Sequence, residues 1–299
     1  MMKHTILVVG SSNTDMVVKT SEFPRPGQTV LGGEFLMNPG GKGANQAVAA
    51  ARLGGQVRFI ARLGEDIFGK QAEINFKEES LDIDFLTFSE EHASGVALIT
   101  VAESGENQIV VASGANMDLL PEHIPDAAFD AVALVVMQCE IPLETVRYIN
   151  EQCLQRQIPV LLNPAPAMGL SEEMLQGLYL ITPNETETEI ITGIRPVDRP
   201  SLEAAAAWFR ERGVQQVVIT LGKDGVYLHN DTQQTIIPAQ EVTAIDTTGA
   251  GDVFNGALAA ALVKGSDLVA ACSFASQAAA VSVTRLGAQS AAPFSWELE

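Results

Sequence analysis

Two acidic residues bracket a run of small residues in the segment DTTGAGDVFNGAL, at positions 246–258. Gly249, Ala250 and Gly251 carry little or no side chain, so their amide groups can approach an anion closely. The apolar stripe that follows predicts a helix, and a helix N-terminus favours an anion. Asp252 at that terminus could accept a proton from an attacking hydroxyl group, the task of the one base in phosphoryl transfer. Considered alone, Asp252 could also be an ordinary helix cap.

A second glycine-rich turn, NPGGKGANQAVAAARLG at positions 38–54, also precedes a helical pattern. It is not a P-loop, because Gly43 rather than Ser or Thr follows Lys42. Neither turn fits the dinucleotide fingerprint, since Gln46 and Phe254 occupy the last glycine positions of the two possible registers. The sequence therefore argues against both of these common phosphate-binding loops.

Polar side chains near the second turn and at predicted strand ends could hold a neutral polyhydroxyl ligand. Gly41 allows close approach, Lys42 is a donor, and Asn45 faces out of the helix start. Amide and carboxylate groups also follow two predicted strands, where ligands of open α/β sheets bind. The candidate sugar-binding residues are Asn13, Asp15, Gly41, Lys42, Asn45 and Glu140. Lys42 and Glu140 could instead be solvated surface residues.

Short apolar runs alternate with helical patterns along the chain. TILVVG, AVALVVMQ and VQQVVITLG are typical of buried parallel strands, and residues 44–51 show helical spacing of their apolar side chains. This alternation predicts an α/β fold, a three-layer α/β/α sandwich with a mostly parallel central sheet. Because no linker or repeat divides the chain, we expect one domain over residues 1–299.

Two stretches break this alternation, at residues 14–36 and 95–111. Each reads as strand, turn and strand without an intervening helix. We expect them to form a small sheet that projects over the ligand side as a lid. Its apolar face could pair with a second subunit.

Composition limits the partners and the compartment. The 18 Lys and Arg residues and 37 Asp and Glu residues give a formal net charge of −19, which disfavours nucleic acid and anionic membranes. The three cysteines lack disulfide or zinc spacing, and neither a signal peptide nor a membrane span is evident. We therefore expect a cytoplasmic protein that acts on small molecules.

The two glycine-rich segments together resemble the two signature motifs of the ribokinase-like carbohydrate kinases, in the order of that family. GSSNTD, NPAPA, TPNETE and VTRLGAQ extend the resemblance along nearly the whole chain. The resemblance implies ATP-dependent phosphorylation of D-ribose at its 5-hydroxyl in ribose catabolism. It also implies a homodimer whose β-lids clasp one another.

The resemblance further implies roles for residues at the two motifs. Asp252 would be the catalytic base, and the amides of Gly249, Ala250 and Gly251 would stabilise the transferring phosphoryl group. The six candidate sugar-binding residues would keep that role.

By the same resemblance, other residues would hold the nucleotide and the ions. Asn184 and Glu187 would support Mg²⁺ and phosphate through water, although Glu187 could simply stabilise a helix start. ATP would be bound by Thr220, Gly222, Gly225 and Gly251, with Ser276 near the adenine. K⁺ would be held, mostly by backbone carbonyls, at Asp246, Thr248, Ser282, Arg285, Gly287 and Ala291. Such an oxygen-rich cage suits a hard cation.

Other functions stay open at this point. The substrate could be another furanose sugar or a nucleoside, such as deoxyribose or a ketohexose. From a different class, the chain could be a sugar-sensing protein without turnover, which the intact Asp252 disfavours. A dehydrogenase is disfavoured by the broken dinucleotide fingerprints.

Overall fold

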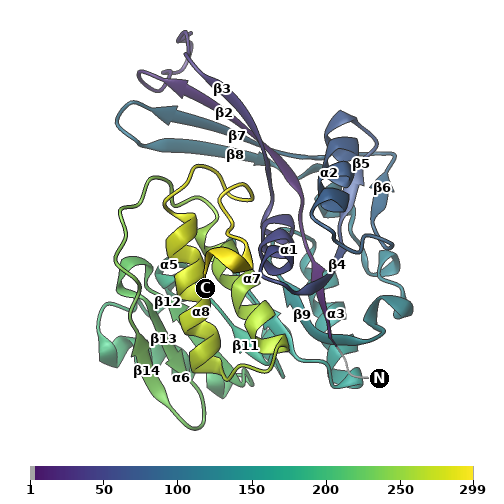
Figure 1. The fold of residues 1–299 in the computed structure, drawn as a ribbon, viewed down its shortest axis with the longest axis vertical. Coiled ribbons are helices and arrows are strands. Elements are labelled where there is room, and N and C mark those ends of the chain that lie inside the picture. The colour runs from purple at the N-terminus through teal and green to yellow at the C-terminus, as the bar shows by residue number, and fades with distance from the viewer. Residues whose placement is uncertain (1–3, 299) are drawn as a thin grey trace.

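The computed structural model describes residues 4–298, and an eight-stranded sheet forms its centre (Figure 1). The strand order is β14-β13-β12-β11-β10-β9-β1-β4, and every pair from β12 to β4 is parallel. The expected mostly parallel sheet is therefore confirmed. The strands are β1 (Thr5–Val9), β4 (Gln56–Ile60), β9 (Val132–Met137), β10 (Val160–Leu162), β11 (Leu180–Ile181), β12 (Gln216–Thr220), β13 (Val226–His229) and β14 (Gln234–Ile237).

Helices cover both faces of this sheet. Successive residues of β1 point to opposite faces, so Ile6 and Val8 join one core while Leu7 and Val9 join the other. The first core is closed by α1, α7 and α8, and the second by α3 and α6. The helices are α1 (Lys42–Arg52), α2 (Ile67–Glu78), α3 (Leu143–Arg156), α4 (Glu172–Leu175), α5 (Glu185–Thr192), α6 (Arg199–Glu211), α7 (Ala250–Val263) and α8 (Leu268–Ser282). Within residues 4–298, no helix is both long and apolar enough to cross a lipid bilayer.

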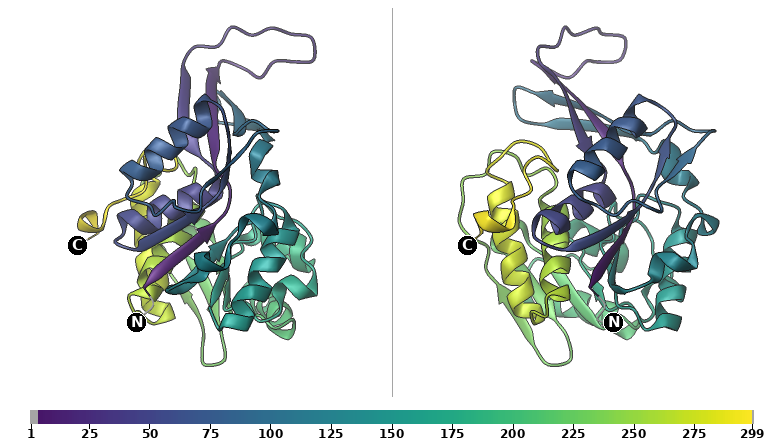
Figure 2. Two further views of the ribbon diagram at one scale, coloured as in Figure 1. Left: turned by 90° about the vertical axis from the view of Figure 1, so that its right-hand side faces the viewer. Right: turned by 45° about the vertical axis from the view of Figure 1, so that its right-hand side comes forward.

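A second sheet stands away from the sandwich, at the top of Figure 1 and in both views of Figure 2. We call it the projecting sheet. Its strand order is β3-β2-β7-β8. The strands are β2 (Asn13–Thr20), β3 (Phe35–Gly40), β7 (Gly95–Ala102) and β8 (Asn107–Ala112). Strands β5 (Arg62–Gly64) and β6 (Thr87–Ser89) form a separate parallel pair.

The return strand of the first hairpin lies later than the stretch 14–36 that sequence indicated. It begins at Phe35 and continues to Gly40, so it includes the first residues of the glycine-rich turn. Residues 21–34 form no strand. Pro24 and Pro26 lie in this segment, and proline has no amide hydrogen to donate to a strand ladder.

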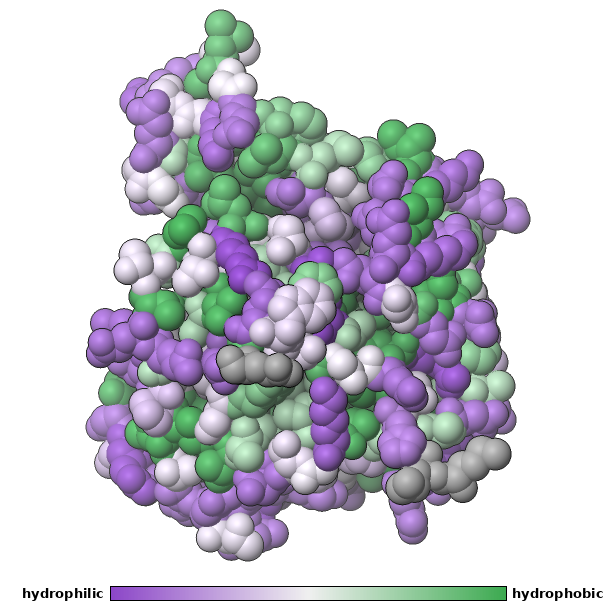
Figure 3. Space-filling model, viewed as in Figure 1, coloured by the Kyte–Doolittle hydropathy of each residue, from purple (hydrophilic) through white to green (hydrophobic). Residues whose placement is uncertain are grey.

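One face of the projecting sheet is apolar and open to solvent. Met16 pairs with Met37 and Leu98 pairs with Val110, which places these four side chains on the same face. Met37 and Leu98 are each 55% exposed and Val110 is 67% exposed. Figure 3 shows hydrophobic surface over this part of the molecule. Contiguous exposed apolar patches are typical of interaction surfaces.

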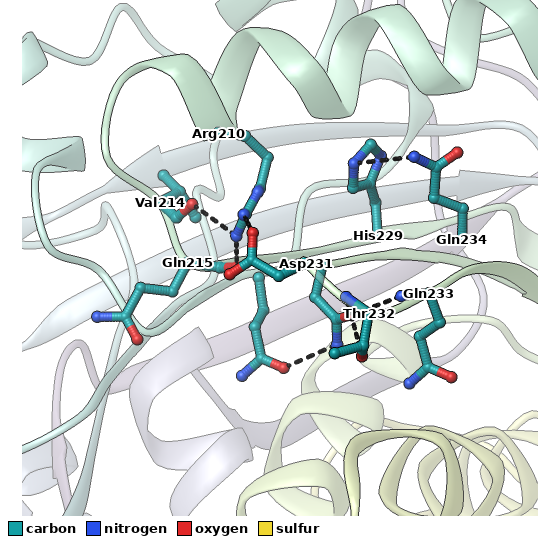
Figure 4. Close-up of polar contacts among 10 residues, drawn as sticks. Arg210, Val214, Gln215, His229, Asp231, Thr232, Gln233 and Gln234 are labelled. Carbon is teal, nitrogen blue, oxygen red and sulfur yellow. Dashed lines mark hydrogen bonds and ion pairs between the residues drawn. The ribbon is translucent and has the colours of Figure 1, made fainter.

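The edge of the central sheet farthest from β4 is an antiparallel hairpin of β13 and β14. The sequence patterns did not reveal this hairpin. Arg210, near the end of α6, donates to the carbonyl of Gln215 and pairs with Asp231 in the hairpin turn (Figure 4). His229 contacts Gln234 across the hairpin. The Arg210 contacts fasten the hairpin to α6.

Candidate active site

Polar side chains follow the carboxyl ends of the parallel strands, where ligands of such sheets bind. A cavity of about 180 Å³ lies among them. It brings together the predicted residues Lys42, Asn184, Glu187, Thr220 and 249–252. It is also lined by Asn163, Thr182, Thr247 and Asn255, which sequence reasoning missed.

Asp252 lies at the third position of α7 and is only 6% exposed. The helix cap is Gly249, with φ of 72°, so the interpretation of Asp252 as a helix cap is wrong. Its carboxylate faces α1 instead. Asn45 Nδ2 donates to Asp252 Oδ2 at 2.9 Å, and Gln46 Nε2 donates to Oδ1 at 3.0 Å.

The small residues before Asp252 leave room for an anion. A Cβ added to Gly251 would meet no atom within 4 Å, so the space above this residue is open. The Ala250 amide donates to the Thr247 carbonyl at 3.2 Å. Among the residues described, the amides of Gly249 and Gly251 have no backbone acceptor, and free amides of this kind at a helix N-terminus favour anions.

The second glycine-rich turn is tied to the end of β9. Glu140 Oε2 accepts from the Ser11 hydroxyl at 2.5 Å and from the Lys42 amide at 3.1 Å. Gly41, with φ of 89°, caps α1 in a conformation that favours glycine. Glu140 and Lys42 are both half-buried, and Lys42 also lines the cavity.

Four carboxylates surround the ammonium group of Lys42 and favour its charged form. Burial alone would lower the pKa of Lys42, but Asp252, Glu140, Glu187 and Asp15 together raise it. Lys42 is thus held protonated beside the cavity. A fixed cation at this place is suited to neutralising the charge of a phosphate.

Asp15 shares this charged cluster. Burial, followed by repulsion from Glu140 and Asp252, raises the pKa of Asp15 to about 6, although Lys42 opposes the shift. Asn13, at the start of β2, accepts from Asn116 Nδ2 at 2.8 Å and lines a separate cavity of about 310 Å³ between α2 and the projecting sheet. Of the six sugar candidates, Asn13 lines this second cavity and Lys42 lines the first.

Asn184 and Glu187 form a reciprocal cap at the start of α5. Asn184 Oδ1 accepts from the Glu187 amide, and Glu187 Oε2 accepts from the Asn184 amide, both at 2.8 Å. Glu187 nonetheless lines the cavity and is 9% exposed. Burial raises its pKa, against the Asn184 amide and Lys42. This carboxylate therefore stabilises the helix start and also faces the cavity.

The structure brings only some of the predicted nucleotide residues to the cavity. Thr220 lines the cavity and pairs with Asn184 through a parallel bridge. Gly222 and Gly225 flank the next turn, a 3₁₀ helix at Gly222–Asp224. Ser276 is buried in α8, and its hydroxyl has no partner among the described residues. None of these last three lines the cavity.

Three of the six predicted K⁺ residues are linked directly. Asp246 Oδ1 accepts from the Thr248 amide and hydroxyl at 2.9 and 2.6 Å, and Oδ2 accepts from the Gly287 amide at 2.9 Å. Burial opposes ionisation, but these hydrogen bonds lower the pKa of Asp246. The Arg285 side chain pairs with Glu297, Ser282 Oγ donates to the Ala279 carbonyl, and Ala291 is buried.

The donor atoms near the cavity suit hard cations. Residues 4–298 contain no cluster of three or more His, Cys, Asp or Glu side chains that could hold a metal ion. Carboxylate, amide and carbonyl oxygens are nevertheless present at Asn184, Glu187 and Asp246. Mg²⁺ typically uses one or two protein oxygens together with water and substrate phosphates, so the set is compatible with it.

The model of the pfkB family of carbohydrate kinases matches residues 3–295. The chain belongs to this family. The resemblance to the carbohydrate kinases is thereby confirmed.

Individual pfkB relatives cover nearly the whole chain. The chain is 42% identical to the ribokinase of Haemophilus influenzae, over 98% of this chain and 96% of that relative. It is 39% identical to the deoxyribokinase of Salmonella typhimurium, over 96% of this chain and 95% of that relative. The Arabidopsis thaliana ribokinase, solved with ribose and ATP, matches with a TM-score of 0.93 at 29% identity, covering 100% of this chain and 98% of that chain.

The residues that sequence reasoning missed are mostly buried amides and hydroxyls around Asp252. Gln46 stands inside the second glycine-rich motif, directly after Asn45, at a position where the dinucleotide fingerprint has glycine. Gln138 and Asn163 follow β9 and β10. Their position at strand ends, which Asn13, Asp15 and Glu140 share, is the signal that could have identified them.

Proposed function

We propose that this pfkB family chain phosphorylates D-ribose at O5 with ATP, giving ribose 5-phosphate and ADP. The observation that carries the proposal is the anchored carboxylate of Asp252 at the N-terminus of α7, beside open glycine backbone and the protonated Lys42. The ribokinase relatives, one of them solved with both ribose and ATP, support this choice of substrates.

In the proposed reaction, Asp252 takes the proton from the primary hydroxyl of the sugar. The hydroxyl oxygen, O5, attacks the γ-phosphorus of ATP at the same time. The bond from that phosphorus to the bridging oxygen breaks, and ADP leaves. The Gly249 and Gly251 amides and Lys42 stabilise the charge on the transferring group. Loss of the base costs roughly 10²–10⁴ in rate.

The sugar is held by the carboxylates and amides at the other end of the site. Asp15 and Glu140 accept hydrogen bonds from ring hydroxyls. Asn45 is suited to this role because its Oδ1 is buried and has no partner among residues 4–298. A sugar hydroxyl would satisfy that acceptor, which otherwise costs about 1–3 kcal/mol.

Two cations complete the proposal. Asn184 and Glu187 would hold Mg²⁺ through water, and the ion would neutralise charge on the phosphates. K⁺ is held at Asp246 and neighbouring carbonyls, next to the turn that carries Gly249. The low pKa of Asp246 supports this assignment, because the carboxylate stays ionised.

The projecting sheet acts as a lid and as the dimer interface in this proposal. Its strand β2 continues from the ligand end of β1, and Asp15 lies on it. Closure would exclude water, which competes with the sugar as acceptor. The exposed apolar face with Met37, Leu98 and Val110 supports a homodimer. The three free, buried cysteines support a cytoplasmic location.

Deoxyribose is the second candidate substrate, because a deoxyribokinase is 39% identical to this chain. Transfer to O5 needs the same base and anion site for either sugar. The difference lies in the hydroxyl contacts, of which Asp15 is the first to test.

The deciding experiment is ADP release with ATP, Mg²⁺ and K⁺ across ribose, deoxyribose, fructose and adenosine. Wild type and Asp252→Asn are compared, with binding of each sugar measured separately by calorimetry. We expect the highest kcat/KM with ribose and a loss of turnover, with binding retained, in Asp252→Asn. Ribose binding without turnover by wild type would favour the sugar sensor. A preference for another sugar would reassign the substrate.

A further inference from the structure

Gln46 is fully buried beside Asp252 and uses both ends of its side-chain amide. Its Nε2 donates to Asp252 Oδ1 and to Asn163 Oδ1, each at 3.0 Å. Its Oε1 accepts from Gln138 Nε2 at 2.7 Å. Because Gln138 offers a donor on that side, the nitrogen of Gln46 must face the carboxylate.

Gln138 is fully buried, and within residues 4–298 its side chain makes one hydrogen bond, the one to Gln46. Its Oε1 has no partner among the residues described, and burying an unpaired acceptor lowers stability. Space for it depends on Gly10, where an added Cβ would lie 2.1 Å from Gln138 Oε1. An apolar side chain would fill this place at a lower cost, so the retained amide points to a role in orienting Gln46.

The backbone brings Gln46 close to α7. A Cβ added to Gly256 would lie 2.6 Å from the Gln46 carbonyl oxygen, so glycine lets α1 and α7 approach one turn beyond Asp252. Gln46 reaches the carboxylate because of this close approach. The hydrogen-bonded chain therefore runs from the end of β9, through α1, to the start of α7.

We propose that Gln46 is a positioning residue for the phosphoryl-transfer step, and that Gln138 sets its orientation. The inference rests on the proposed role of Asp252 as base. Gln46 fixes one carboxylate oxygen and Asn45 fixes the other, so the carboxylate plane cannot rotate away from the acceptor hydroxyl. Neutral amides achieve this without placing another charge beside the phosphate.

The test is steady-state kinetics of Gln46→Met and Gln138→Met with the sugar that wild type prefers. Methionine keeps the length of the side chain but has no donor. We expect kcat to fall roughly 10- to 100-fold in Gln46→Met, the order of effect produced by a misplaced catalytic group. KM for sugar and for ATP should stay within about twofold. Gln138→Met should lower kcat by a smaller factor.

Asn150→Leu is the matched control for loss of a buried amide. Asn150 donates to the carbonyls of Met174 and Gln176, its Oδ1 also lacks a partner among the described residues, and it lies on α3. This variant should lower the melting temperature and leave kcat per folded molecule unchanged. A loss of kcat in Asn150→Leu equal to that in Gln46→Met would show a merely structural role and overturn the inference.

Two further kinetic outcomes would count against the proposed positioning role of Gln46. Unchanged kcat in Gln46→Met, or a rise in sugar KM as large as the fall in kcat, would overturn the positioning role. Crystal structures of wild type and Gln46→Met provide a readout independent of turnover. We expect the Asp252 carboxylate to be rotated in the variant, and an unmoved carboxylate would contradict the inference. Failure of wild type to phosphorylate any sugar would refute the proposed function, while the carboxylate comparison would still decide the role of Gln46.

Discussion

The side-chain amide of Asn45 donates to the carboxylate of Asp252 at 2.9 Å, although 207 positions separate the two residues. The two ends of the Asn45 amide therefore have different tasks in the proposed reaction: Nδ2 holds the proposed base, and Oδ1 can bind the sugar. The Asn45 Oδ1 atom is buried without a partner among the described residues, which leaves it available to a hydroxyl.

Asn45→Leu should therefore impair both binding and turnover. Losing a buried hydrogen bond costs about 1–2 kcal/mol, so we expect sugar KM to rise roughly 5- to 30-fold. We expect kcat to fall as well, because one tie on Asp252 is gone. Steady-state kinetics with varied sugar separate the two effects. A variant that lost kcat alone would show that Asn45 does not contact the sugar.

Asp15→Asn should stabilise the ligand-free protein at neutral pH while weakening sugar binding. The pKa of Asp15 is raised from 3.8 to about 6, first by burial and then by Glu140 and Asp252. Between these values the folded protein keeps a proton that the unfolded chain has lost. The contribution of Asp15 to the free energy of unfolding therefore falls as pH rises through this window, and above it the buried charge is a cost.

Urea unfolding at pH 5 and pH 8 measures this effect. We expect the free energy of unfolding of Asp15→Asn to be about 1–3 kcal/mol higher than that of wild type at pH 8. The difference should be smaller at pH 5. An equal difference at both pH values would show that Asp15 keeps an ordinary pKa.

Gly251→Ala and Gly43→Ala should fail for different reasons. A Cβ at Gly251 meets open space, whereas one at Gly43 would lie 2.6 Å from the backbone of Gly10 and Ser11. Gly251→Ala should keep its melting temperature and lose kcat roughly 10²-fold, because the methyl group occupies the phosphate position. Gly43→Ala should lose about 2 kcal/mol or more of stability through overpacking. Thermal unfolding and kinetics distinguish them, and a destabilised Gly251→Ala would contradict the open anion site.

Leu98→Glu should dissociate the proposed dimer. Leu98 lies on the apolar face of the projecting sheet and is 55% exposed, and a carboxylate there could not be buried unpaired in an interface. Light scattering coupled to size exclusion should report a monomer. Ile236→Glu, at a 44% exposed site on β14, should leave the oligomeric state unchanged. A dimer that survives Leu98→Glu would place the interface elsewhere.

Asp246→Asn should remove stimulation by K⁺. The Asp246 carboxylate joins Thr248 to Gly287, and its lowered pKa keeps it ionised. Activity measured in K⁺ and in choline salts should differ in wild type and become similar in the variant. Arg285→Gln is the control, because that side chain pairs with Glu297 and only its carbonyl is assigned to the ion. A K⁺ response retained in Asp246→Asn would remove this carboxylate from the proposed site.

Local patterns predicted most of the elements that position the site. The apolar runs correspond to β1, β9 and β12, and the small residues at 249–251 mark the start of α7. The hairpin of β13 and β14 was missed, because short edge strands give little periodic signal. The return strand β3 was expected too early, because its end merges with the glycine-rich turn.

The sequence by itself determined that a carboxylate would stand at a helix start beside glycine backbone, because backbone freedom and helix signals depend on neighbouring residues. Only the tertiary structure decided how that carboxylate is held. Gln46 and Gln138 lie 92 positions apart, and Gln46 and Asp252 lie 206 apart. They meet because parallel strands end at one edge and two helices cross at Gly256, and such contacts depend on packing that no local pattern encodes.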